Sequence, residues 1–167
     1  MDIKILLDKQ RELDIFIAKE KNLGNAYDKK FLEDRKLALL VEVGEFANTT
    51  RCFKYWSNKG PEAKEVILDE AADCLHFILS LINLTNIQAK FNLEDIAMSA
   101  KLVLEIGPVN LITGFNTLFE LVTKEYWEDA LKSLIALVTV LGFTLKELHE
   151  AYLKKHEVNY QRQRLGY

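Results

Sequence analysis

Four acidic side chains stand in two closely spaced pairs, Glu42 with Glu45 and Glu70 with Asp73. On an α-helix, residues three positions apart point only about 60° away from each other, so each pair shares one side of its helix. Carboxylates placed in an apolar helix interface are unfavourable unless something neutralises them. Four converging carboxylates with no basic residue among them therefore indicate bound divalent cations, and ligands that are all oxygen favour Mg²⁺ or Mn²⁺. The apolar residues that share these helix sides are Leu39, Phe46, Ile67, Cys74 and Phe77.

Two other interpretations of the acidic residues are weaker. Exposed acidic pairs at this spacing are common, but aliphatic neighbours of this kind are unusual on a solvated face. Asp73 and His76 could suggest zinc, yet no cysteine or second histidine has matching spacing. Four negative charges suit about two divalent cations and a polyphosphate substrate whose oxygens complete the metal shells.

Helices must position these carboxylates, because apolar residues recur with helical spacing through most of the chain. No segment alternates with a period of two, so we expect an all-α helical bundle whose four-helix core carries the acidic pairs. Pro61 fits the first turn of the third helix, and Thr144 with Glu147 predicts a capping box. The expected helices run from residue 3 to a stop before residue 23, then over 31–50, 61–84, a short segment from residue 92, 111–124, 128–141 and 144–161.

Length and composition favour one soluble domain spanning residues 1–167. The 49% of hydrophobic residues is ordinary for a globular protein, and a net charge of −3 gives no electrostatic reason to bind nucleic acid. The first residues lack the apolar core of a signal peptide, and the longest apolar stretch is too short to span a membrane. Cys52 and Cys74 indicate reduced thiols and a cytoplasmic location.

Two segments carry a resemblance to a known family. LLVEVGEFANTTRCFKYWS, followed by DEAADCLHFILSL, resembles the dimeric all-α dUTPases, which belong to a wider set of all-α nucleoside triphosphate pyrophosphohydrolases. The four carboxylates alone would indicate only the wider set. Gln10 with Asp14, the loop at residues 53–57 and the C-terminal residues 155–167 are similar to motifs of the narrower family. His156 departs from the family pattern, which usually has asparagine there.

The resemblance implies hydrolysis of dUTP to dUMP and pyrophosphate, which lowers dUTP and supplies dUMP for thymidylate synthesis, and it leaves dUDP open as a second substrate. Glu42, Glu45, Glu70 and Asp73 would hold Mg²⁺, and Glu45 or Glu42 would orient or deprotonate the attacking water. The remaining residues are expected to bind the nucleotide: Lys54, Lys155 and Arg162 the phosphates, Asn159 the nucleotide or a water, His76 and Phe77 the deoxyribose, and Gln10, Asp14 and Trp56 the uracil.

Alternatives stay open at this point. The chain could be an all-α pyrophosphohydrolase for another nucleotide, such as dCTP or one with a damaged base, or a phage-type helical module that binds a regulatory protein. A homodimer is expected, with the interface on the apolar helices after the site, although Leu134, Leu137, Val138 and Leu141 fit a monomer core equally well. Gly44, between the first two glutamates, either makes room for a neighbouring helix or is simply tolerated.

Overall fold

The computed structural model describes residues 2–87, 92–106 and 110–166, and within these ranges the chain is helical without strands. The all-α prediction is therefore confirmed. The helices are α1 (Ile3–Glu20), a short 3-10 turn η1 (Lys29–Phe31), α2 (Leu32–Thr50), α3 (Lys64–Thr85), α4 (Leu93–Ile106), α5 (Leu111–Thr123), α6 (Trp127–Val140) and α7 (Leu145–Arg164).

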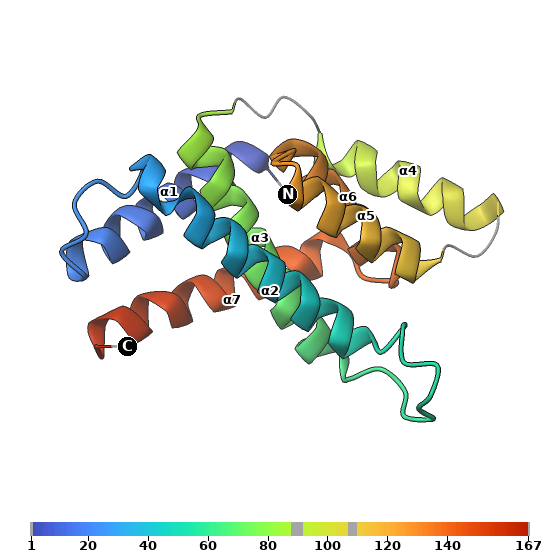
Figure 1. The fold of residues 1–167 in the computed structure, drawn as a ribbon. Helices are drawn as coiled ribbons and strands as arrows, with labels where there is room; N and C mark the ends of the chain where they lie inside the picture. Colours follow the sequence, from blue (N-terminus) through green and yellow to red (C-terminus); the bar gives the residue numbers. More distant parts are fainter. Residues whose placement is uncertain (1, 88–91, 107–109, 167) are drawn as a thin grey trace.

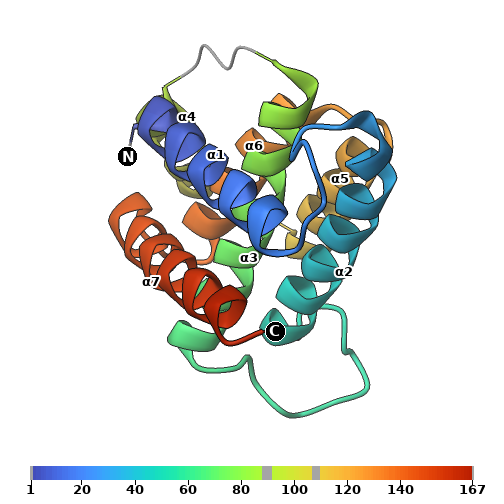
Figure 2. The same ribbon diagram turned by 90° about the vertical axis from the view of Figure 1, so that its left-hand side faces the viewer.

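Helix α3 is the centre of the bundle. It packs against α1, α2, α6 and α7, and Figure 2 shows it between α1 and α7 on one side and α2 on the other. Apolar residues buried all round a helix are typical of such a central element, and Leu75, Ile78, Leu79 and Leu81 are completely buried. Helices α4, α5 and α6 form the other side of the molecule in Figure 1. None of the described helices is both long enough and apolar enough to cross a membrane.

Side-chain caps fix the starts of α1, α5 and α7. The Thr144 side chain accepts from the Glu147 N–H while the Glu147 carboxylate accepts from the Thr144 N–H, so the predicted capping box is confirmed. The prediction that the third helix starts at Pro61 is wrong, because α3 begins only at Lys64. The Glu62 N–H donates to the carbonyl of Thr49 at 2.9 Å, which holds the chain against the end of α2 before the helix starts.

The apolar helices after the site mainly build the monomer core. Leu134 and Val138 are fully buried and Leu137 is 3% exposed within the single chain, and Leu141 is half-buried. A Cβ atom on Gly44 would meet only Phe119, at 4.0 Å, so no close helix approach requires glycine there.

Candidate active site

The first acidic pair, on α2, faces the second acidic pair, on α3. These helices run antiparallel, so the C-terminal half of α2 lies beside the N-terminal half of α3. Glu42, Glu45 and Glu70 each offer a carboxylate oxygen, and these three oxygens lie within 4.8 Å of one another. Three oxygen donors at this spacing fit a hard divalent cation.

The fourth carboxylate is held by a cation from the last helix. Lys155 Nζ lies 2.5 Å from an oxygen of Asp73 and 2.7 Å from one of Asp69. The expectation that no basic residue would lie among the carboxylates is therefore wrong. It failed because Lys155 stands 82 positions after Asp73 in the sequence (155 − 73) and reaches the acidic residues only through the packing of α7 on α3.

The clustered charges change the proton affinity of the site. Burial, followed by the charges of Asp73, Glu45 and Glu70, raises the pKa of Glu42 to about 7. Burial and the neighbouring acidic residues also raise the pKa of Glu70. Such shifts mean that the folded chain holds these negative charges together only at a cost, which a bound cation would relieve.

A cavity of about 520 Å³ opens beside the carboxylates and extends between α1, α2, α3 and α7. Its volume is that of a small-molecule binding site. The cavity brings together eight of the residues predicted from the sequence: Gln10, Asp14, Glu42, Asp73, His76, Phe77, Asn159 and Arg162.

A buried hydrogen-bond chain fixes the state of His76 at the wall of this cavity. Gln10 Nε2 donates to Asp14 at 2.8 Å, so the Gln10 oxygen is left to accept from His76 Nδ1 at 2.7 Å. Burial, with the neighbouring His156, lowers the pKa of His76 to about 3, so the ring is neutral. Its Nε2 atom is consequently an acceptor, and it is buried without a partner in the described structure. A ligand hydroxyl or N–H group would satisfy it.

The sequence analysis missed residues that bind Asp14 or line the cavity beside it. Asp14 accepts from Ser80 at 2.7 Å and from the Tyr27 hydroxyl at 3.2 Å. Arg35 also lines the cavity. The sequence spacing places two of them on the same helix face as predicted site residues. Arg35 precedes Glu42 by seven residues and Ser80 follows Asp73 by seven, and seven residues are almost two full helical turns.

Helix α7 is anchored by aromatic packing. Tyr160 packs on Phe16 of α1 with ring centroids 4.7 Å apart, and the His76 ring stacks on Tyr152 at 4.2 Å. His156 is buried and its Nε2 lies 3.1 Å from the carbonyl oxygen of Lys9. The departure from the family pattern at this position therefore serves the contact between α7 and α1.

Two predicted residues belong neither to the cavity lining nor to the carboxylate cluster with its lysine. Lys54 and Trp56 lie in the connection between α2 and α3, which projects away from the helices in Figures 1 and 2. Trp56 is 65% exposed, and its ring packs on those of its neighbours Phe53 and Tyr55. Neither residue lines the cavity beside the carboxylates.

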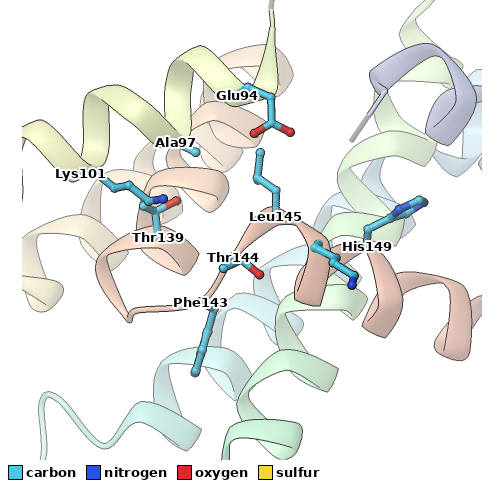
Figure 3. Close-up of a pocket in the computed structure, with 9 residues that line it drawn as sticks. Glu94, Ala97, Lys101, Thr139, Phe143, Thr144, Leu145 and His149 are labelled. Carbon is cyan, nitrogen blue, oxygen red and sulfur yellow. The ribbon is translucent and has the colours of Figure 1, made fainter.

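A second cavity, of about 340 Å³, lies between α4 and the connection from α6 to α7 (Figure 3). Its wall combines Glu94 and Lys101 of α4 with His149 of α7. None of the carboxylates of the first cluster lines it, so the larger cavity is the candidate active site.

Comparison with known proteins decides the family. A family model described as dUTPase matches residues 2–167. The chain belongs to the dUTPase family. The resemblance drawn from the sequence motifs is thereby confirmed, and family membership makes the chain a dUTP diphosphatase. A dUTPase implies a divalent metal, and the Glu42, Glu45 and Glu70 cluster fits one. None of the curated proteins compared with the chain matches it.

Proposed function

We propose that this dUTPase hydrolyses dUTP to dUMP and pyrophosphate with Mg²⁺ as its metal, Mn²⁺ as a substitute and dUDP as a second substrate. The observation that carries the proposal is the cavity that joins the carboxylates to the buried Gln10–Asp14 network. One end suits a metal with phosphates, and the other offers the fixed polar groups that a base requires.

The metal would be held by Glu42, Glu45 and Glu70, with Asp73 joining them once Lys155 leaves it. Bound there, the metal supplies charge neutralisation for the phosphates and activation of water. Lys155 is then free to contact the substrate, since its ammonium lies beside the same carboxylates. In this way one lysine would exchange a carboxylate for a phosphate when the metal and the nucleotide arrive.

Glu45 is our candidate for the residue that orients the attacking water and takes its proton. It is exposed, whereas burial and neighbouring charge raise the pKa of Glu42 to about 7. Glu42 is half-buried and lines the cavity, so we assign it to metal ligation.

The nucleoside is placed by the cavity walls. His76 Nε2, a neutral acceptor without a protein partner, suits the deoxyribose 3′-hydroxyl. Phe77 would pack against the sugar and leave no space for a 2′-hydroxyl. Gln10 and Asp14 would bind the uracil edge, while Asn159 and Arg162, which line the same cavity from α7, would contact the nucleotide and its phosphates.

Closure of the connection between α2 and α3 would add Lys54 and Trp56 to the site.

We further propose that residues 1–167 form one domain, that the protein acts as a homodimer, and that it is cytoplasmic. Exposed apolar residues on α2 and α4 are available for a subunit interface: Leu37, Val41, Met98 and Leu102.

Product analysis by phosphorus NMR tests the reaction. Incubation of dUTP with the protein and Mg²⁺ is expected to give dUMP and pyrophosphate, with UTP, dTTP and dCTP turned over far more slowly. Release of inorganic phosphate with dUDP would refute the proposed products. Faster turnover of another nucleotide would refute the assignment of the base and sugar contacts.

A further inference from the structure

Arg35 lines the cavity, and the described residues use only part of the hydrogen-bonding capacity of its guanidinium group. Its Nη2 donates to the carbonyl of Ala26 at 2.6 Å, and its guanidinium lies over the rings of Tyr27 and Phe31, at 5.6 and 5.9 Å from their centroids. These contacts hold the side chain in one orientation. The described structure gives it no carboxylate within ion-pair distance.

The other terminal nitrogen of Arg35 has no hydrogen-bond partner within the part of the chain that the structure describes. Nη1 is buried, and it is one of three buried side-chain atoms without a hydrogen-bond partner among the described residues, with His76 Nε2 and Gln163 Oε1. All three belong to residues that line the same cavity. Buried polar atoms are almost always satisfied, so three exceptions around one cavity indicate groups that water satisfies in the empty cavity and a ligand can satisfy when bound.

The position of Arg35 determines which part of a ligand it meets. It stands seven residues before Glu42 on α2, about 10 Å along the helix on the same face. On the antiparallel α3, Ser80 stands seven residues beyond Asp73, at the same end. Arg35 therefore lies at the end of the cavity opposite the carboxylates, too far from them to share a phosphate held by the metal.

We propose that Arg35 Nη1 donates a hydrogen bond to the O4 carbonyl of the uracil and so selects uracil over cytosine. This inference rests on the proposed function. O4 is the base atom farthest from the sugar, and a guanidinium can donate but never accept. Asp14, which lines the same end, supplies an acceptor beside this donor. The pair therefore matches the N3–H and O4 groups of uracil.

Cytosine presents the opposite pattern at the same two positions. Its N4 amino group would face a donor, and its N3 acceptor would face a carboxylate. A site built to hydrogen-bond one group strongly rejects an analogue that lacks it, because its own polar groups are left unpaired. Thymine keeps O4 and N3–H, so Arg35 does not distinguish dTTP from dUTP.

The test compares kcat/KM for dUTP, dCTP and dTTP in the wild type, Arg35→Gln and Arg35→Met, with Mg²⁺ present. The preference for dUTP over dCTP is expected to fall by about 10- to 100-fold in both variants, the range for a lost hydrogen bond to a charged group. The preference for dUTP over dTTP should stay the same. Lys36→Gln is the matched control, because Lys36 is the next residue and pairs with Glu33 and Glu125 away from the cavity.

Two results would overturn the assignment of Arg35. One is an unchanged ratio of dUTP to dCTP turnover. The other is an equal loss for all three nucleotides, which would mean that Arg35 only supports the fold. Failure of the proposed function is a distinct result, since the wild type itself would then not turn over dUTP. Binding of dUMP and dCMP by calorimetry gives a second readout that does not depend on the chemical step.

Discussion

Replacing Lys155 with methionine removes the ammonium group that Asp69 and Asp73 share, while keeping most of the buried alkyl chain. The Lys155 side chain is 8% exposed, that of Asp73 is 18% exposed and that of Asp69 is 46% exposed. In the metal-free protein this change removes the ion-pair partner of two more carboxylates beside Glu42, Glu45 and Glu70. The variant should therefore be less stable, and the loss should depend on metal.

The size of the loss follows from the burial of the group. Removing one partner of a fully buried ion pair costs about 3–5 kcal/mol, and the partial exposure of Asp69 reduces this to about 2–3 kcal/mol. For a protein of this size each kcal/mol shifts Tm by about 2–4 °C, so Tm should fall by about 4–12 °C in EDTA. A divalent cation can replace the missing charge, so Mg²⁺ should restore more than half of the loss.

Thermal unfolding in EDTA and in saturating Mg²⁺ measures both effects. Lys154→Met is the matched control, because Lys154 is the exposed neighbour on the same helix. Its Tm should change by less than about 2 °C under either condition. An equal loss for the Lys155 variant with and without Mg²⁺ would refute the reasoning, since the lysine would then be a structural cation independent of the metal.

Three further predictions concern the site and the core. Mn²⁺ affinity, measured by calorimetry, should be about tenfold weaker at pH 6 than at pH 8, because the proton on Glu42, with its pKa of about 7, competes with the metal below that pH. Glu42→Gln should reduce this dependence, leaving the smaller contribution of Glu70, whose pKa is also raised. Phe77→Ala should raise UTP turnover relative to dUTP by about tenfold in a kinetic assay, and an unchanged ratio would mean that Phe77 only fills the core. In urea unfolding, Gly114→Ala should lower the free energy of unfolding by about 1–3 kcal/mol, because the new Cβ would lie 2.7 Å from Leu137. Gly44→Ala should raise the free energy of unfolding by about 0.5–1 kcal/mol, and a decrease would contradict the open space beside Gly44.

Local patterns predicted the helices and the placement of the acidic residues well. Residues three apart on a helix must share a face, so Glu42 with Glu45 and Glu70 with Asp73 could be paired without a structure. The capping box at Thr144 was equally local, because its two hydrogen bonds join residues only three positions apart. The dUTPase resemblance supplied the other predicted cavity residues, including those from α1 and α7.

Contacts between distant segments were not predictable in this way. Lys155 reaches Asp73 from the last helix, and nothing in the spacing of either residue indicates that meeting. The start of α3 was placed three residues too early because proline is favoured in a first turn, whereas a backbone bond from Glu62 to Thr49 delays the helix. Arg35 was missed although its seven-residue spacing from Glu42 places both residues on one face of α2, because the sequence alone does not show that this face lines a cavity.

The initial rate of pyrophosphate release from dUTP, measured after removal of metal with EDTA and during Mg²⁺ titration, tests the central claim most directly. We expect no turnover without metal, saturable turnover with Mg²⁺, and a loss of at least about 100-fold in kcat for Glu45→Gln. Turnover of dUTP that persists in EDTA, or that is undiminished in the Glu45 variant, would contradict hydrolysis at this carboxylate site.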